Sequence, residues 1–171
     1  MNKYAMIVAL DSNNGFSKNN TIPWHYPEDF QHFRKLTTSY PCVMGRNTYV
    51  EIDQKLGHKQ PNVLPNRPCY LISKTVNQSD FDNVTVIPSY EFKDLEFFVD
   101  NDSKVFFIGG EQIFYYALQY VDTIYLTRIQ RDYGCDQVLD MDYIWDNFKL
   151  DHIEQKGGDP DLLFLTYIRD K

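Results

Sequence analysis

A near-continuous apolar run at the start of the chain constrains the fold most. Residues 4–10 read Tyr-Ala-Met-Ile-Val-Ala-Leu, without alternation between apolar and polar side chains. A strand of this kind is covered on both faces, which is typical of a parallel sheet flanked by helices. Five further strands are expected after it, at residues 42–44, 69–73, 84–87, 105–108 and 124–129.

The segments between these strands carry helix signals. Helices are expected at residues 27–38, from 47 or 48 to 52, at 89–99 and at 112–120, with Asn47 or Thr48 capping the second and Ser89 the third. The polar stretch 53–66 is expected to be a loop. In the tail, Gly157-Gly158-Asp159-Pro160 separates two strand-like runs, 148–153 and 162–168, which predicts an antiparallel hairpin. With 171 residues, 43% of them hydrophobic, we expect one α/β domain spanning residues 1–171, with a mixed, mostly parallel central sheet flanked by helices.

The first expected helix carries an acidic residue on its apolar side. Pro27 suits the first turn, where its missing N–H is no loss. On a wheel of ~100° per residue, Asp29 falls within the apolar stripe of Phe33 and Leu36, whereas His32 is expected on the polar side. A carboxylate in the stripe is costly unless something pairs with it. Two interpretations stay open: a buried Asp bonded to backbone or to a hydroxyl, or a carboxylate in an apolar cleft that meets a cationic or amidine-like ligand group.

Two kinds of loop could serve a ligand. Residues 11–21 are rich in turn formers and poor in core formers, and a loop of this length is either disordered or functional, most often as a lid. Gly45-Arg46 ends one strand and Gly109-Gly110 another, each before an expected helix whose first N–H groups would face an anion. A plain strand–helix turn remains the alternative, since the dinucleotide fingerprint GxGxxG is absent.

Composition and charge argue against several classes of protein. The net charge of −7 disfavours a general nucleic-acid binder, and no apolar run reaches membrane-spanning length. Residues 1–4 lead into the first strand without a signal-peptide pattern, so we expect a cytoplasmic protein. Cys42, Cys69 and Cys135 are widely spaced and are expected to be free thiols. The four histidines lack metal-ligand spacing, so no metal site is expected.

Several motifs follow one another in an order that resembles the dihydrofolate reductase family. They are Ile22-Pro23-Trp24 with Asp29 and Phe33, Val43-Met44-Gly45-Arg46-Asn47-Thr48, Leu64-Pro65-Asn66-Arg67, Ile108-Gly109-Gly110 and Tyr125-Leu126-Thr127. The resemblance covers nearly the whole chain. It implies a dihydrofolate reductase-like fold and a monomer that reduces 7,8-dihydrofolate to tetrahydrofolate with NADPH and so supplies one-carbon metabolism.

The resemblance also assigns roles to single residues. It implies that Asp29 is the carboxylate that binds the pterin, that Thr127 bonds this carboxylate and that Trp24 holds an ordered water. Arg67 resembles the arginine that binds the α-carboxylate of the glutamate tail. The apolar positions around the pterin and the benzoyl group are Ile7, Val8, Phe33, Ile52, Leu64 and Ile108. The cofactor positions are Ala9, Phe16, Ser17, Ile22, Gly45, Arg46, Asn47, Thr48, Ile72, Ser73, Lys74, Ile108, Gly109, Gly110, Glu111, Gln112 and Ile113.

These roles predict a mechanism and a cofactor preference. Asp29 faces the far side of the pterin from N5, so we expect it to bind and polarise the ring while a water delivers the proton. Arg46 and Lys74 each follow a strand. If those strands are neighbours, both cations emerge at one edge of the sheet, where they could bind the extra phosphate of NADPH.

The sequence departs from the family pattern at three places. Ser17 precedes Lys18 where the family lid usually carries glycine, although Gly15 could supply flexibility nearby. Phe114 stands where a tyrosine is frequent, and Glu51 where a small polar residue is common. Two other functions therefore stay in view, a related NADPH-dependent pyrimidine reductase of riboflavin biosynthesis and a catalytically inactive nucleotide-binding or scaffold protein.

Overall fold

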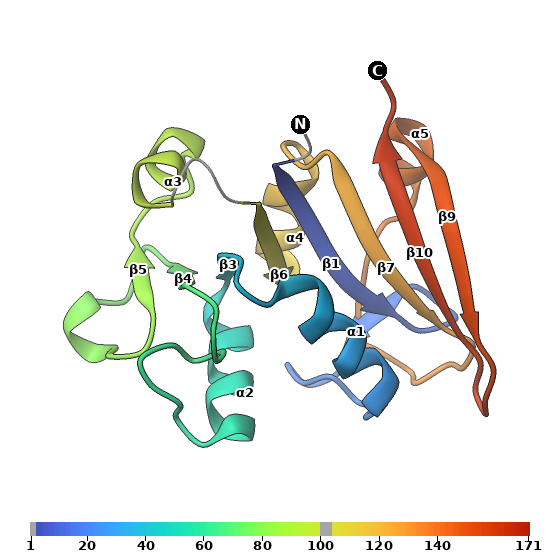
Figure 1. Ribbon diagram of the computed structural model, residues 1–171, viewed down its shortest axis with the longest axis horizontal. Coiled ribbons are helices and arrows are strands. Elements are labelled where there is room, and N and C mark those ends of the chain that lie inside the picture. Colours follow the sequence, from blue (N-terminus) through green and yellow to red (C-terminus); the bar gives the residue numbers. More distant parts are fainter. Residues whose placement is uncertain (1–2, 100–103) are drawn as a thin grey trace.

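A computed structural model describes residues 3–99 and 104–171 of the chain (Figure 1). Met1 and Asn2, which belong to the stretch that lacks a signal-peptide pattern, lie outside the described residues. The main sheet has eight strands in the order β5-β4-β3-β6-β1-β7-β10-β9. Their bounds are β1 Tyr4–Leu10, β3 Cys42–Met44, β4 Cys69–Ile72, β5 Thr85–Ile87, β6 Val105–Gly109, β7 Thr123–Ile129, β9 Phe148–Lys156 and β10 Leu162–Arg169.

Six of these strands run parallel, and the last two close the sheet as an antiparallel hairpin. β1 pairs in parallel with β6 and β7, and β3 with β4 and β6, whereas β10 runs antiparallel to both β7 and β9. The prediction of a mixed, mostly parallel sheet with a C-terminal hairpin is therefore confirmed.

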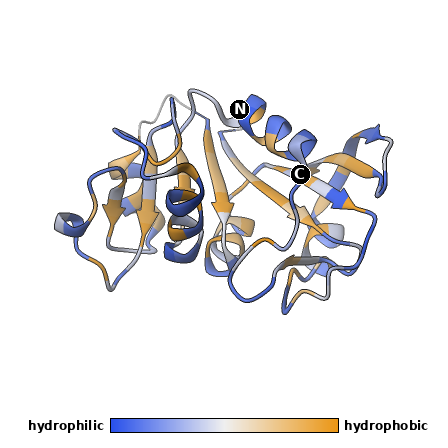
Figure 2. Cartoon of the chain, turned by 90° about the horizontal axis from the view of Figure 1, so that it is seen from below, coloured by the Kyte–Doolittle hydropathy of each residue, from blue (hydrophilic) through white to orange (hydrophobic). Residues whose placement is uncertain are grey.

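Helices cover both faces of the sheet, as the apolar run in the first strand predicts. Ala5 and Ile7 of β1 belong to a core cluster with residues of α1 and α2, whereas Met6 and Val8 belong to a cluster with residues of α3, α4 and α5. In Figure 2 the strands are mostly hydrophobic and the helices carry both colours. The helices are α1 Pro27–Thr37, α2 Arg46–Leu56, α3 Phe92–Phe98, α4 Glu111–Leu118 and α5 Asp142–Asn147, with one short 3₁₀ helix, η1 Gln78–Asp80.

Helix α2 differs from its prediction at both ends. It begins at Arg46 with Gly45 as the N-cap residue, so neither Asn47 nor Thr48 caps it. It continues past Ile52 to Leu56, so the start of the expected loop 53–66 is helical, and Gly57 ends it with φ +75. A buried Tyr49, whose hydroxyl bonds to Asn83, holds the helix against the sheet, and such tertiary packing overrides the weak local signal.

The prediction for the next helix is wrong by a few residues. Ser89 does not cap it, because the Ser89 hydroxyl accepts the N–H of Glu91, which is itself extended, and α3 begins only at Phe92. On α1, His32 is half-buried instead of lying on a polar face. Its ring stacks on Phe164 of β10 with centroids 4.1 Å apart, and burial lowers its pKa. Strand β10 thus packs against α1, and a helical wheel drawn for α1 alone cannot show this contact.

The predicted loop 11–21 and the following Ile22, together called the lid segment, are more ordered than a plain loop. Within it, β2 (Gly15–Ser17) pairs antiparallel with β8 (Gln137–Val138), and neither strand was predicted. Asp11 is buried, and its carboxylate accepts the N–H groups of Asn13, Gly15 and Tyr133. Gly15 serves close packing here, because a Cβ added to it would lie 2.4 Å from the Cβ of Cys135.

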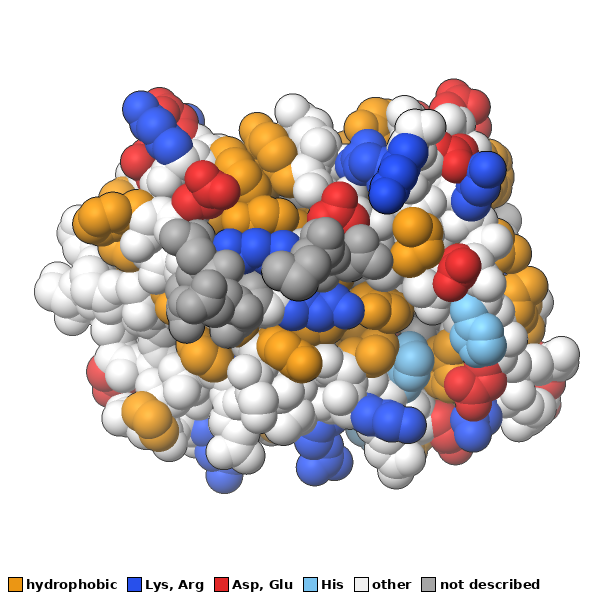
Figure 3. Space-filling model, turned by 45° about the horizontal axis from the view of Figure 1, so that its top comes forward, with side chains coloured by type: hydrophobic (Ala, Val, Ile, Leu, Met, Phe, Trp, Pro, Cys, Tyr) orange, Lys and Arg blue, Asp and Glu red, His pale blue; other side chains and the backbone are white. Residues whose placement is uncertain are grey.

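The three cysteines are free thiols, as predicted, and burial raises the pKa of Cys69 to about 11. On the face in Figure 3, acidic and basic side chains are interspersed among hydrophobic ones. Within residues 3–99 and 104–171, no helix is long and apolar enough to cross a membrane. The same residues hold no group of three or more His, Cys, Asp or Glu side chains arranged for a metal ion.

Candidate active site

A cavity of about 460 Å³ opens between α1, α2 and the lid segment. Its floor consists of the carboxyl ends of the central strands, with Ile7 to Ala9 from β1 and Ile108 from β6. The parallel strands bring these ends to one edge, which is where open α/β sheets bind their ligands. Phe33 from α1 and Ile52 from α2 add apolar side chains to its walls.

Asp29 provides the carboxylate of this cavity. Pro27 stands at the start of α1, so Asp29 lies in the first turn with its side chain among the lining residues. The Thr127 hydroxyl from β7 hydrogen-bonds to it. Burial raises the pKa of Asp29, and the bond from Thr127 offsets part of that rise. The carboxylate is therefore bonded to a hydroxyl and also lines the cleft, and its contact with a ligand group stays a prediction.

A carboxylate in this setting is suited to one kind of ligand group. It has two acceptor oxygens, so an amidine-like edge with two N–H donors can bond to both at once. The apolar walls exclude water and strengthen that interaction. Among the described residues, no lysine or arginine forms an ion pair with Asp29, so its charge is left for a ligand to meet.

Gly45, Gly109 and Gly110 line another part of the cavity, beside the N-termini of α2 and α4. We call these three residues the glycine cradle. Gly45 and Gly110 are the N-cap residues of α2 and α4, and the Gly45 N–H donates to the Gly109 carbonyl at 2.7 Å. Gly109 has φ +122, and a Cβ there would lie 3.0 Å from the Phe114 ring. Bare backbone beside two helix N-termini accommodates phosphates, so the cradle fits the pyrophosphate of a dinucleotide such as NADPH.

A second hollow continues the cradle over the sheet edge. It shares Ser73, Thr75, Tyr90, Glu111 and Gln112 with the main cavity and adds Lys74 and Tyr115. β3 and β4 are parallel neighbours, so the condition for placing Arg46 and Lys74 at one edge is met. The Lys74 ammonium lies 5.7 Å from the centre of the Tyr90 ring.

Most of the predicted site residues line the main cavity. These are Ile7, Val8, Ala9, Phe16, Ser17, Ile22, Asp29, Phe33, Gly45, Arg46, Asn47, Thr48, Ile52, Ile72, Ser73, Ile108, Gly109, Gly110, Glu111, Gln112, Ile113 and Thr127. Their position fits the roles that the resemblance implies, and the roles themselves stay predictions.

Four predicted residues do not line it. Lys74 lines only the second hollow, and Leu64 is buried in the core against α2. Trp24 is buried, with its ring 5.2 Å from that of Tyr133. Arg67 is only 5% exposed, because its guanidinium donates to the Pro65 carbonyl and to the Thr37 hydroxyl.

The structure adds lining residues that the sequence reasoning did not assign to the site. They are Asn20, Phe30, Thr75, Tyr90 and Gln137. Glu51 and Phe114, which the sequence marks as departures from the family pattern near the ligands, line it too. Thr75 directly follows the predicted Ser73 and Lys74, so proximity in the sequence could have found it. Tyr90 and Gln137 reach the cavity through the fold and carry no local signal. The Phe114 ring stands perpendicular to that of Phe16 from the lid segment, with centroids 5.3 Å apart.

Comparison with known proteins agrees with this architecture. The family model described as dihydrofolate reductase matches residues 3–169. Dihydrofolate reductase type 9 of Escherichia coli is 36% identical over 141 residues, covering 80% of this chain and 75% of that protein. Dihydrofolate reductase of Bacillus subtilis is 30% identical over 167 residues, covering 95% and 92%.

The fold has a solved counterpart. A structure of dihydrofolate reductase from Enterococcus faecalis, complexed with NADP(H) and RAB-propyl, superposes with a TM-score of 0.79 over 99% of this chain and 98% of that one, at 24% identity. This likeness concerns the fold. The family match over nearly the whole chain, together with relatives at 30% identity or more, shows that the chain belongs to the dihydrofolate reductase family.

Proposed function

We propose that this protein reduces 7,8-dihydrofolate to 5,6,7,8-tetrahydrofolate with NADPH, placing a hydride on C6 and a proton on N5. The observation that carries the proposal is the position of Asp29, in an apolar cavity that continues into a glycine cradle. The pterin ring has an amidine-like edge formed by its 2-amino group and N3, which matches a carboxylate, and a dinucleotide matches the cradle.

Asp29 binds and orients the substrate. Its two oxygens accept the N–H groups of the 2-amino group and N3, and the Thr127 hydroxyl keeps the carboxylate in place. This contact polarises the ring toward the protonated form, which accepts a hydride more readily at C6. Asp29 lies on the far side of the ring from N5, so a water delivers that proton.

The glycine cradle and the lid segment bind and seal the other half of the site. NADPH, when bound, supplies the hydride. Gly45, Gly109 and Gly110 leave room for the backbone to approach the pyrophosphate. Arg46 and Lys74 stand at the strand ends beside it, and Phe16 and Ser17 of the lid segment line the cavity and exclude bulk water.

The proposal also covers the oligomeric state of the protein and its location in the cell. We place the protein in the cytoplasm as a monomer that acts on a small molecule and binds no nucleic acid. The net charge of −7 supports the last point, since a general nucleic-acid binder concentrates positive charge.

One spectrophotometric assay tests the proposed reaction. Purified protein is mixed with NADPH and either dihydrofolate or a pyrimidine intermediate of riboflavin synthesis, and the oxidation of NADPH is followed. Oxidation that depends on dihydrofolate is the expected result. Oxidation with the pyrimidine alone would assign the protein to the riboflavin pathway, and oxidation with neither would make it an inactive binder.

A further inference from the structure

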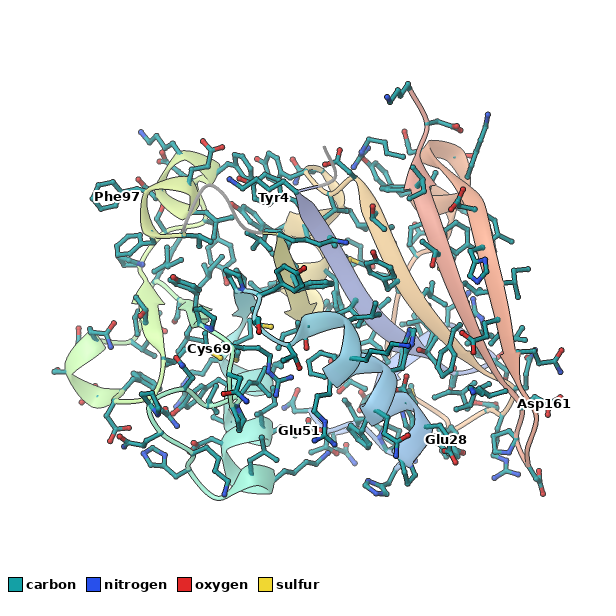
Figure 4. The ribbon with its side chains drawn as sticks, in the orientation of Figure 1. Tyr4, Glu28, Glu51, Cys69, Phe97 and Asp161 are labelled. Atoms are coloured by element: carbon teal, nitrogen blue, oxygen red, sulfur yellow. The ribbon has the colours of Figure 1, made fainter. Side chains whose placement is uncertain are left out.

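Glu51 on α2 joins two walls of the cavity. Its carboxylate Oε1 accepts the backbone N–H of Ile22 at 3.2 Å, and Ile22 is the last residue of the lid segment. Both residues line the cavity. Figure 4 places Glu51 on α2, beside the segment that leads into α1. The bond therefore joins two lining segments of the cavity, the helix and the end of the lid segment.

Apart from bonds within the lid segment itself, its other hydrogen bonds lead to residues 128–139. Its first half is held by Asp11 and by the pairing of β2 with β8, and the Asn19 N–H donates to Asp136 at 2.9 Å. Within residues 3–99 and 104–171, the bond to Glu51 is the one hydrogen bond that ties the lid segment to α2. Without it, the carboxyl end of the lid segment loses its polar attachment to that wall.

The surroundings of the Glu51 carboxylate favour its bond to the Ile22 N–H. The side chain of Glu51 is only 13% exposed, which is low for a glutamate. Lys55, one helical turn further along α2, places its ammonium 2.9 Å from the same Oε1, but this half-exposed pair contributes little to holding the carboxylate. A charged acceptor binds an N–H more strongly than a neutral one, so glutamate serves here better than a small hydroxyl residue.

We propose that Glu51 is a positioning residue that latches the lid segment shut over the cavity and thereby slows the release of bound ligand. The proposal concerns lid closure, and only its second test rests on the proposed function. Two rival roles exist for the same carboxylate. It could form a helix-surface ion pair with Lys55 alone, or it could act through its charge and repel anionic ligands from the mouth.

The first test measures hydrogen exchange at the Ile22 amide in the ligand-free protein. Glu51→Ala removes the acceptor, so exchange should accelerate about 5-fold, which lies in the range for the net contribution of a typical hydrogen bond. Glu51→Gln keeps an acceptor oxygen without the charge, so exchange should lie between Glu51→Ala and wild type. Lys55→Met is the matched control: it removes the ion pair, keeps the stem and leaves the latch bond, so exchange should stay within about 2-fold of wild type.

Two outcomes of this test would overturn the proposal. One is unchanged exchange in Glu51→Ala, since the Ile22 amide would then have no dependence on the carboxylate. The other is equal acceleration in Glu51→Ala and Lys55→Met, which would reduce Glu51 to a partner in a surface ion pair. Far-ultraviolet circular dichroism of each variant verifies that the fold persists.

The second test measures the dissociation rate of NADPH by stopped flow. A latch predicts faster release from Glu51→Ala, by about 3- to 10-fold, with partial rescue in Glu51→Gln. A carboxylate that only repels anions predicts the opposite sign, because NADPH would leave more slowly once the charge is gone. If the wild type did not bind NADPH, the proposed function would fail while the exchange test would still decide the latch.

Discussion

Asp29 is a charged side chain in a place that disfavours its charge. Burial raises its pKa in the folded protein, so the folded state holds this proton more tightly than the unfolded chain does. Wild-type stability therefore falls as the pH rises from the ordinary carboxyl range through the raised folded pKa. A site that tolerates this cost is one in which a ligand makes use of the carboxylate.

Replacing Asp29 with asparagine should stabilise the protein. The amide keeps the shape and does not titrate, so Asp29→Asn should gain about 1 kcal/mol in the free energy of unfolding near pH ~7. The gain should shrink through pH ~4 and vanish below pH ~3, where the carboxyl is protonated in both states. Urea denaturation of both proteins across this range is the measurement. A gain that does not change with pH would show that the charge of Asp29 is not its cause.

Arg67 should affect both substrate binding and stability. If it pairs with the glutamate tail, Arg67→Leu raises the KM for dihydrofolate by ~10–100-fold and spares a pteridine that lacks the glutamate. The variant should also lose ~1–3 kcal/mol of stability, because the Thr37 hydroxyl and the Pro65 carbonyl lose their donor. Arg34→Leu, which removes a nearby exposed cation, is the control for long-range charge. Equal losses for both ligands would make Arg67 structural.

At the scale of the element, the lid segment depends on the space beside Gly15. Gly15→Ala places a Cβ 2.4 Å from the Cβ of Cys135, so β2 must shift. We expect hydride transfer to slow by ~10–100-fold, since a displacement of this size misaligns the reactants. The double variant Gly15→Ala, Cys135→Gly should recover much of the rate, and Gly157→Ala, where nothing lies within 4 Å, is a neutral control. Without recovery in the double variant, contact with Cys135 would not explain the loss.

Elements with a strong local signal could be predicted, and those formed by distant partners could not. The apolar run of β1 and the hairpin of β9 and β10 are visible in the sequence because their side chains alone require burial or pairing. β2 is a Gly-Phe-Ser segment that becomes a strand only by pairing with residues 137–138, more than a hundred positions away. Helix α2 extends beyond its predicted end at residue 52 because the Tyr49 hydroxyl bonds to Asn83, which lies in a distant loop.

The candidate site could be predicted only through the order of its motifs. Asp29 and the glycine pair could be singled out from helical and turn patterns, but those patterns left a plain turn or a buried aspartate open. Phe30, Tyr90 and Gln137 belong to the cavity because separate segments converge on it. Such convergence has no local signature in the chain.

At the scale of the whole molecule, the preference for NADPH over NADH should come from local cations, because the overall charge of the protein is negative. The net charge of −7 repels a polyanion at long range, so Arg46 and Lys74 must provide the attraction. Arg46→Ala and Lys74→Ala should each weaken NADPH binding by ~1–3 kcal/mol and barely change NADH binding. Equilibrium titration with both cofactors checks this, and NADPH affinity should also fall as salt rises. Equal weakening for both cofactors would exclude recognition of the extra phosphate.

The proposed reduction depends on the carboxylate of Asp29 taking part in it. The most direct measurement is the single-turnover rate of hydride transfer from NADPH to dihydrofolate in wild type and in Asp29→Asn, which avoids product release. We expect a folded variant whose rate at neutral pH falls by at least ~100-fold, as for loss of a positioned acid–base group. A folded variant with a near-normal rate would contradict it.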